Sequence, residues 1–392
     1  MHVAIIGGRL QGLEAVYLAK KAGYKTLLID KDHHVPAADL CDRFLCLDLL
    51  TLADHHQHHQ LQAALTQDID LIIPALENRS ALDTLTSLSA LTGVPLAFDP
   101  AAYDLSSSKL KSDRFFTELG LPQPLPWPEG TFPYIAKPSA ASGSEGVRLL
   151  ENEAGLQRFI SETAATPDQY VIQEYIEGPS YSIEVIGDGK RFIPLQVTDL
   201  YMDEQYDCKR VVAPSSLSAA QQADFAALAV TLATKIGLQG IMDVEVILHD
   251  RQLKLLEIDA RLPSQTPTAV YHSTGINILE LLASVFTGSG RLQQTPLPPP
   301  THPKAAIFEH LTVKNGHLQT AGEHVIAAAG PLSHKFDFFG ADEALTDYSP
   351  GLTGWVATLI ITAGDRNAAL NKREEVVAMI TREMNLKRGR ED

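Results

Sequence analysis

The sequence predicts an α/β protein with an α+β middle, and three observations support this. Strands and helices alternate through the first hundred residues, which is typical of a parallel sheet with right-handed crossovers. From residue 131 the pattern changes to short strands separated by loops. A Gly- and Pro-rich stretch at 288–300 then precedes a last region of mixed strands with a C-terminal helix. We therefore expect three domains, over residues 1–100, 101–290 and 291–392.

The first domain is expected to be a parallel sheet covered by helices. Its predicted strands are short apolar runs, and the segments between them carry apolar residues at helical spacing. One helix is expected over residues 11–22 and another directly after the third strand. The four strands are expected at HVAIIG (2–7), KTLLID (25–30), IDLIIPA (69–75) and VPLAF (94–98).

The middle region is expected to combine short strands with separate helices. SSKLKSDRFFTELG (107–120) is typical of a helix that ends at Gly120, and a Pro-rich connector follows it. Two more helices are expected, over residues 218–236 and at INILELLASVFTG. The strands are expected at PYIAK, GVRLL, YVIQEYI, YSIEVIG, RFIPLQV, IMDVEVILHD and QLKLLEIDA.

Composition excludes several classes of protein. The 392 residues carry a formal net charge of −16, which disfavours a nucleic-acid partner because phosphate-backbone binding needs clustered Lys and Arg. There is no run of about 18 apolar residues, so no membrane span is expected. Three cysteines cannot form a disulfide framework, and no signal peptide is expected because the N-terminal residues read as a strand. We expect a cytoplasmic protein that acts on small molecules, and the sequence allows a homo-oligomer.

The turn GGRLQG (7–12), between the first strand and the first helix, is similar to a dinucleotide-binding fingerprint. In G-x-G-x-x-G the second glycine lets the backbone approach a pyrophosphate, but Arg9 occupies that position here. Asp30 does end the second strand, as a ribose-binding acid would, so an NAD(P)-dependent oxidoreductase remains an alternative. The glycines could instead serve a tight turn only, or the turn could belong to a small-substrate site at the carboxyl ends of the strands.

The stretch IAKPSAASGSEGVRLL has the features of a phosphate-binding loop. Lys137 is placed to neutralise phosphate, and residues 139–146 form a small, flexible loop whose N–H groups could cover a triphosphate. The spacing is not that of a Walker-type loop. Lys109, near the start of the preceding helix, offers a second cation.

A possible adenine-binding segment follows in VIQEYIEG. It has the pattern of a hinge, in which a strand, a short exit and another strand succeed one another. Backbone groups around Glu174 to Ile176 could bind an adenine edge, and Gln173 could reach its amino group.

The strongest pattern is the acidic hairpin in IMDVEVILHDRQLKLLEIDARLPSQTP. Glu245 lies on one strand, and Glu257 and Asp259 share a face of the next because strands have a period of two. Carboxylates gathered among apolar neighbours repel one another unless a cation is present, and hard oxygen ligands suit Mg²⁺. Asp243 follows the same alternation as Glu245 and could replace it as a ligand. Arg261, two residues further, can bind a phosphate or carboxylate bidentately.

Together these motifs resemble the ATP-grasp superfamily of carboxylate–amine ligases over nearly the whole chain. The resemblance implies an ATP-grasp fold with a Rossmann-like N-terminal domain and a C-terminal domain that completes the core. It also implies ATP and Mg²⁺, with two ions held by Glu245, Glu257 and Asp259. The residues implied for ATP are Lys109, Lys137, Ser142, Gly143, Ser144, Gln173, Glu174 and Ile176. Those implied for the transferred phosphoryl group or the acyl substrate are Arg210 and Arg261.

Two positions depart from the family pattern. Many members have Glu after the hinge Gly-Pro to hold the ribose, and here the residue is Ser180. The last metal ligand is often Asn, and here it is Asp259, which adds a negative charge. The ribose contacts are therefore unassigned, and the need for a metal cation increases.

More narrowly, GGRLQGLEA, DCKRVVAP and LLEIDARLPSQTPTAVYHSTGINILELL resemble the 3-methylornithine–L-lysine ligases of pyrrolysine biosynthesis. This implies that ATP phosphorylates the carboxylate of a D-ornithine-type amino acid and that the ε-amine of L-lysine attacks the acyl phosphate. The implied amino-acid site contains Leu10, Gln11 and Gly12, with Glu77 as an anchor for an ammonium group. Another ATP-grasp ligase or a carboxylase is the main alternative.

Overall fold

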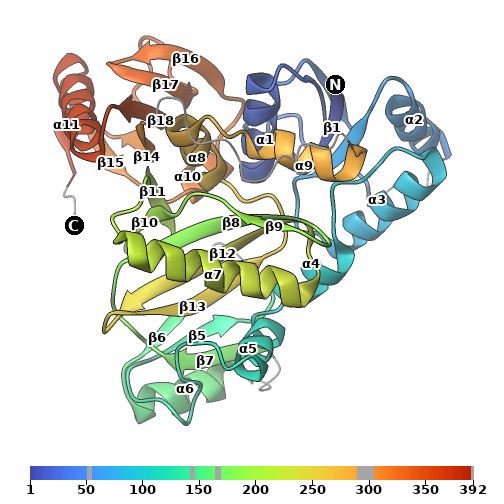
Figure 1. Ribbon diagram of the computed structural model, residues 1–392. Helices are drawn as coiled ribbons and strands as arrows, with labels where there is room; N and C mark the ends of the chain where they lie inside the picture. Colours follow the sequence, from blue (N-terminus) through green and yellow to red (C-terminus); the bar gives the residue numbers. More distant parts are fainter. Residues whose placement is uncertain (51–54, 142–145, 164–168, 289–303, 390–392) are drawn as a thin grey trace.

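Three sheets make up the part of the chain that the structure describes. The computed structural model describes residues 1–50, 55–141, 146–163, 169–288 and 304–389. A four-stranded parallel sheet lies at the N-terminus, a three-stranded antiparallel sheet in the middle, and a twelve-stranded, mostly antiparallel sheet crosses the molecule. Figure 1 shows the two smaller sheets at different corners of the large one. No helix of these residues is long and apolar enough to cross a membrane.

The N-terminal sheet has the strand order β3-β2-β1-β4, and each strand is parallel to its neighbours. Its apolar strands are fully buried because helices pack on the sheet. The helices are α1 (Leu10–Lys21), α2 (His55–Thr66) and α3 (Arg79–Thr92). The strands are β1 (His2–Ile6), β2 (Lys25–Asp30), β3 (Arg43–Cys46) and β4 (Leu71–Pro74).

Two strands of this sheet differ from the prediction. Strand β3 lies in the polar stretch where no strand was expected, and it is a short, half-exposed edge strand with weak apolar alternation. The expected strand VPLAF forms only an isolated parallel bridge between Ile72 and Leu96. Pro95 has no N–H group, so this segment bonds to β4 only through the Pro95 carbonyl and the Ala97 amide.

The small sheet, in the order β6-β5-β7, forms a separate lobe with its own core. Helix α4 (Pro100–Ser106) connects the parallel domain to α5 (Lys109–Glu118), which lies beside this lobe in Figure 1. Helix α6 (Glu153–Thr163) packs against β6 through Leu156 and Phe159. The strands are β5 (Tyr134–Pro138), β6 (Arg148–Leu150) and β7 (Tyr170–Glu174).

The large sheet runs in the order β13-β12-β8-β10-β11-β14-β18-β17-β16, with β9, β15 and β19 paired at its sides. Strand β11 pairs with β14, so the strands after residue 304 continue the sheet that begins in the middle region. The boundary expected near residue 290 falls among 289–303, outside the described residues. The strands of the large sheet that precede residue 289 are β8 (Ser180–Asp188), β9 (Phe192–Pro194), β10 (Thr198–Met202), β11 (Cys208–Ala213), β12 (Gln239–His249) and β13 (Gln252–Asp259).

The C-terminal part of the sheet is covered by α11 (Arg366–Glu383), which contributes Val376, Val377 and Ile380 to the core. This region was predicted only as mixed strands and a C-terminal helix, and the structure agrees with that pattern. Its remaining elements are β14 (Ala305–Lys314), β15 (His317–Thr320), α10 (His324–Ala327), β16 (Ser333–Phe338), β17 (Ala341–Thr346), β18 (Trp355–Ala363) and β19 (Lys387–Arg388).

The two faces of strands β8 and β12 differ in character. Alternate residues such as Ile183 and Val244 pack against α7 (Ala219–Ile236), which lies across the sheet in Figure 1. The residues between them, including Glu184 and Asp243, therefore point to the opposite face. The sequence alternation thus builds an apolar core against α7 on one side of the sheet and gathers carboxylates on the other, where Ile186 and Ile241 also join an apolar cluster with α9.

Three helices show how local sequence sets helix bounds. Helix α7 begins after Ser218, which forms a capping box with Gln221, and it ends at Gly237 in a left-handed conformation. Helix α9 (Ile278–Thr287) has Asn277 as its N-cap and agrees with the predicted helix. Helix α8 (Thr266–Thr274) was not predicted, although Pro267 at its first turn is a typical helix start.

The glycines of the first turn are required by close packing. A Cβ atom on Gly7 would lie 2.4 Å from the Ala75 carbonyl oxygen, and Gly7 also has a φ of 102°. A Cβ atom on Gly12 would lie 2.0 Å from the Gly7 carbonyl oxygen. Helix α1 can therefore pack against this turn only if both residues lack a side chain.

Replacing Gly12 with Ala is expected to lower the free energy of unfolding by about 1–3 kcal/mol, because the added methyl group forces α1 away from the turn. The matched control is Gly155→Ala, at the corresponding third position of α6, where the nearest atom would be 3.8 Å away. That variant is expected to be as stable as the parent or slightly more stable. Urea unfolding of the variants measures the difference, and equal stability would contradict the packing argument.

Candidate active site

The central feature of the site is the hairpin of β12 and β13, which was predicted from the sequence. Two consecutive residues of its turn have positive φ angles, 48° and 65°, as in a tight hairpin turn. The register places Glu245 opposite Glu257 and Asp243 opposite Asp259. Four carboxylates from two neighbouring strands therefore lie beside one another on the same face of the sheet.

Crowding perturbs the protonation of these groups. Burial, together with the nearby Asp243 and Glu257, raises the pKa of Glu245 well above its usual range. Burial also raises the pKa of Asp259 to about 7, although the guanidinium of Arg261 opposes this shift. A cation among these oxygens would remove the repulsion. A set of hard carboxylate donors, partly shielded from water, fits a site for Mg²⁺.

Two lysines lie beside the hairpin, as expected. Lys109, at the start of α5, places Nζ 2.5 Å from Glu257 Oε1 and 2.8 Å from the Ala141 carbonyl oxygen. Lys137 lies in β5, where burial lowers its pKa while Glu257 opposes the effect. The small lobe thus brings two amino groups to the acidic hairpin, and both line the same cavity.

Asp243 and Glu245 differ in their surroundings. Asp243 is buried, accepts a hydrogen bond from the Ser182 hydroxyl and lies opposite Glu184 on β8. Glu245 is half-buried and lines two adjoining cavities, whereas Asp243 lines only the smaller of them. Of the two residues left open by the sequence, Glu245 is therefore the more exposed to a ligand.

A cavity of about 380 Å³ lies between the small sheet and the large sheet. It is lined by Lys109 and Lys137 at one side and by Glu245 and Glu257 beside them. The hinge residues Gln173, Glu174 and Ile176 also line it. The loop residues Ser142, Gly143 and Ser144 lie outside the described residues.

The hinge residues Gln173 and Glu174 are held in place by neighbouring parts of the chain. Gln173 is buried and pairs with β5, and the Glu174 amide donates to the Leu125 carbonyl oxygen. The Glu174 carboxylate binds Lys254 Nζ at 2.8 Å. The side chain of Glu174 is therefore paired with Lys254, while Glu174 and the neighbouring Ile176 both line the cavity.

Arg261 lies just after β13, between two carboxylates. Its Nε is 2.7 Å from Glu77 Oε1, and its Nη2 is 3.1 Å from Asp259 Oδ2. Burial alone would lower the pKa of Arg261, but Asp259 and Glu77 raise it, so the side chain stays charged. Among the described residues, no hydrogen-bond partner is seen for Nη1. The arginine is fixed in place and retains donors for an anionic ligand.

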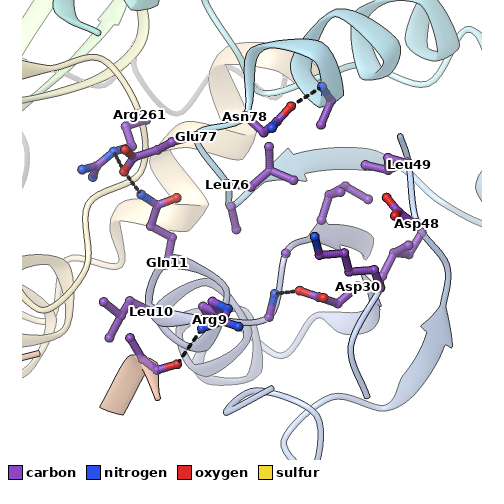
Figure 2. A pocket seen from close by; sticks show the side chains of 18 of the residues that line it. Arg9, Leu10, Gln11, Asp30, Asp48, Leu49, Leu76, Glu77, Asn78 and Arg261 are labelled. Atoms are coloured by element: carbon purple, nitrogen blue, oxygen red, sulfur yellow. Dashed lines mark hydrogen bonds and ion pairs between the residues drawn. The ribbon is translucent and has the colours of Figure 1, made fainter. Parts of the chain in front are cut away.

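A second cavity, of about 440 Å³, opens at the carboxyl ends of the parallel strands. Leu10 and Gln11 line it from the start of α1, and Glu77 lines it from the end of β4. Figure 2 shows Gln11 and Arg261 converging on Glu77, whose Oε1 accepts from Gln11 Nε2 at 2.6 Å. Glu77 therefore contacts Arg261 and Gln11, and its expected role as an anchor for a substrate ammonium group stays a prediction.

A third cavity, of about 130 Å³, joins the other two. It shares Glu245 and Glu257 with the cavity between the sheets, and it shares Arg261, Ser264 and Glu323 with the cavity of the parallel domain. The acidic hairpin thus lies where the three cavities adjoin.

Two predicted site residues lie elsewhere. Arg210 does not line any of these three cavities as the described residues define them. It stacks on the ring of Tyr201 at 4.3 Å and lies 3.6 Å from Glu309, which is bound by the buried Arg373. Gly12 is likewise absent from the described wall of the parallel-domain cavity, because it packs against Gly7.

Several residues that line the cavities were not predicted from the sequence. Met202 and Tyr206 line the cavity between the sheets, and Ser264, Gln265 and Glu323 line the joining cavity. Ser264 and Gln265 directly follow the predicted hairpin in the sequence. Their closeness to the predicted carboxylates could therefore have identified them as lining residues. Glu323 lies more than sixty residues away from the hairpin, and no sequence pattern connects it to the site.

The fold and the site together define a protein of the ATP-grasp class. The ATP-grasp domain family matches residues 106–265. The chain is similar in structure to the biotin carboxylase domain of 2-oxoglutarate carboxylase from Hydrogenobacter thermophilus, with a TM-score of 0.73 and 17% identity over 96% of this chain and 89% of that one. It is also similar to an L-amino acid ligase from Bacillus licheniformis, with a TM-score of 0.69 and 15% identity over 96% and 97%. These likenesses confirm the predicted fold.

A closer sequence relationship gives the family. The chain is 35% identical over 373 residues to 3-methyl-D-ornithine–L-lysine ligase of Methanosarcina acetivorans, which covers 95% of each protein. The chain belongs to this family of ATP-grasp carboxylate–amine ligases. The resemblance inferred from the sequence motifs is therefore confirmed.

Without divalent cations, Glu245→Gln is expected to raise the melting temperature by about 1–3 °C, because it removes one of the crowded buried charges. Glu257→Gln is the matched variant and is expected to lower it, because Lys109 loses its ion-pair partner. Calorimetry in EDTA measures both shifts. Added Mg²⁺ should stabilise the parent protein more than Glu245→Gln. Equal shifts in the two variants would contradict the repulsion argument.

Proposed function

We propose that this protein joins the carboxylate of a D-ornithine-type amino acid, such as 3-methyl-D-ornithine, to the ε-amine of L-lysine at the expense of ATP. The observation that carries this proposal is the meeting of three adjoining cavities at the acidic hairpin and Arg261. An enzyme that phosphorylates a carboxylate and then transfers the acyl group needs this arrangement, because the nucleotide and the amino acid must approach one another end to end.

The nucleotide is proposed to occupy the cavity between the small and large sheets. Adenine would bind the backbone near Glu174 and Ile176, with Gln173 beside it. Lys109 and Lys137 would neutralise the phosphates, and the loop of residues 142–146 would cover them. This agrees with relatives of the fold whose structures contain ADP or MgADP.

Glu245, Glu257 and Asp259 are proposed to hold two Mg²⁺ ions with the help of phosphate oxygens. Bound Mg²⁺ would neutralise negative charge on the nucleotide phosphates. The donor set fits this role because all three side chains are carboxylates on one face of the hairpin and lie next to the nucleotide cavity. Arrival of the nucleotide would free Glu257 from its ion pair with Lys109.

The acyl substrate is proposed to lie in the cavity of the parallel domain. Its carboxylate would bind Arg261, which Glu77 and Asp259 hold in position. Leu10 and Gln11 would border the substrate at the start of α1, where free N–H groups favour an anionic group. The substrate would then direct its carboxylate towards the terminal phosphate of ATP.

The proposed reaction has two steps. A carboxylate oxygen attacks the γ-phosphorus of ATP, which forms an acyl phosphate and releases ADP. The lysine amine then attacks the acyl carbon, the bond to phosphate breaks, and an amide and inorganic phosphate are formed. Arg261 and the two lysines stabilise charge during the first step. The acyl phosphate must be kept from water during this step.

The dinucleotide alternative is not favoured by the geometry of the first turn. Asp30, the candidate ribose ligand, accepts a hydrogen bond from the Gly8 amide at 2.7 Å and so holds the turn itself. The Arg9 side chain extends to the Ala327 carbonyl oxygen. The competing proposal is that the protein is another ATP-grasp ligase or a carboxylase. The substrate that the protein accepts distinguishes the two proposals.

The first test supplies the protein with ATP, Mg²⁺, D-ornithine and L-lysine and follows phosphate release and product mass. We expect an amide product only when both amino acids are present. Phosphate release that does not depend on either amino acid would contradict the proposed substrates, and a screen of other carboxylates would follow.

The two arginines predicted for the site are expected to differ sharply in how much their replacement lowers the ligation activity. Arg261→Lys should lower kcat/KM for ligation by about 100-fold or more, because lysine cannot bind a carboxylate bidentately. Arg210→Lys is the matched control and should retain activity within a few fold, because Arg210 lies away from the cavities. Steady-state kinetics of both variants measures this, and similar losses in the two would contradict the assigned position of the substrate carboxylate.

A further inference from the structure

Glu323 stands at the wall between the acyl-substrate cavity and the joining cavity. It directly precedes α10 and lines both spaces. Its Oε2 accepts hydrogen bonds from Ser264 Oγ at 2.7 Å and from Gln265 Nε2 at 2.8 Å. Among the described residues, no partner is seen for Oε1. One carboxylate oxygen is thus fixed by the loop after β13, and the other is left for a ligand.

Gln265 provides a second, independent sign of a ligand. Its side chain is 4% exposed, and its Nε2 donates to Glu323 Oε2 and towards the Cys208 carbonyl oxygen. Both neighbours are acceptors, so the amide can be oriented in only one way. Within the described residues its Oε1 is a buried acceptor without a donor, in the wall of the joining cavity. Such an orphaned acceptor calls for an N–H or O–H donor from a bound molecule.

The backbone at Gln265 is strained in a way that produces this arrangement. Its φ of 71° and ψ of −60° are unusual for a residue with a side chain. Such strain is found mainly where function requires a fixed geometry. Here it turns the amide of Gln265 towards Glu323.

The charges around Glu323 suit a cationic ligand. Burial raises the pKa of Glu323, the bonds from Ser264 and Gln265 lower it, and Asp207 raises it further. The other titratable groups that face it are Arg261, Cys208, Glu14 and its neighbour His324. Arg261 is already bound by two carboxylates, and His324 is bound by Asp207, so neither neutralises Glu323 by contact.

We propose that Glu323 Oε1 and Gln265 Oε1 form the subsite for the primary amine of the second substrate, and that Glu323 accepts a proton from that amine. This inference rests on the proposed function and names the base that the ligation requires. Glu323 is then a catalytic residue, and Gln265 and Ser264 are positioning residues that hold it. The subsite lies next to Arg261, where the acyl carboxylate is proposed to bind, so the amine and the acyl carbon are neighbours.

The protons and electrons of the step balance. The amine arrives as an alkylammonium ion with three N–H bonds. One proton moves to Glu323, and the nitrogen lone pair attacks the acyl carbon. The C–O bond to phosphate breaks, and the departing phosphate keeps the electron pair and takes the second proton. The amide retains the third, and protonated Glu323 returns its proton to solvent.

The test separates acyl activation from amine attack by exchanging the nucleophile. Hydroxylamine is largely neutral near pH 7, so it can trap the acyl phosphate as a hydroxamate without a base. The experiment measures hydroxamate from D-ornithine, ATP and Mg²⁺, and separately the amide formed with L-lysine. The variant is Glu323→Gln, and the control is Glu375→Gln on the exposed side of α11.

Glu323→Gln is expected to lower kcat/KM for L-lysine by about 100-fold or more while hydroxamate formation stays within about threefold of the parent. Its residual lysine-dependent rate should rise about tenfold for each pH unit between about 7 and 9, because only the free amine reacts and its pKa is about 10.4. The control should match the parent in both assays. Normal hydroxamate formation also shows that the variant is folded.

Two results would overturn the inference. One is an unchanged rate with L-lysine, and the other is an equal loss of hydroxamate and amide, which would place Glu323 in acyl activation or in folding. A parent protein that forms no hydroxamate from D-ornithine would instead contradict the proposed function. The failure of the subsite and the failure of the ligase proposal are therefore distinguishable.

Discussion

The repulsion among the carboxylates of the β12–β13 hairpin is the constraint on which the site depends. Glu245, Glu257 and Asp259 lie together because the alternation of strand residues gives one face to the core against α7 and the other to charge. The core on one side fixes the strands, so the acids cannot move apart to relieve their repulsion. Folding energy from the apolar face thus holds the carboxylates together, and Lys109 supplies a counter-charge from beside the small lobe.

Arg261 connects this charged hairpin to the parallel domain. Its ion pairs reach Asp259 on one side and Glu77 on the other, and Glu77 in turn accepts from Gln11 at the start of α1. This guanidinium group is one of several links between the two parts of the chain, together with the hydrogen bonds that Thr268 donates to Glu14. Under the proposed function, the same group would face both the acyl substrate and the phosphate.

The sequence predicted those parts of the fold and site that depend on local pattern. The parallel sheet, the capped helix α7, the hairpin and the two lysines follow from periodicity and from residues close together in the chain. That Arg210 lies away from the three cavities could not be predicted, because a period of two does not tell which face of β11 meets a cavity, and the register shifts next to it at Tyr201 and Met202. Glu323 could not be foreseen, since only the long-range packing of α10 brings it to the loop after β13.

The pairing of β11 with β14 places the strands after residue 304 in the same sheet as the acidic hairpin. Residues 210–213 bond to residues 306–309 along four consecutive pairs. A fragment that stopped near residue 290 would leave β11 as an open edge, with Val211 and Val212 beside unpaired backbone groups. Exposed apolar edges of this kind recruit other chains, so such a fragment would self-associate instead of folding as an independent module. The Gly- and Pro-rich stretch thus separates two regions of the sequence whose strands belong to one sheet.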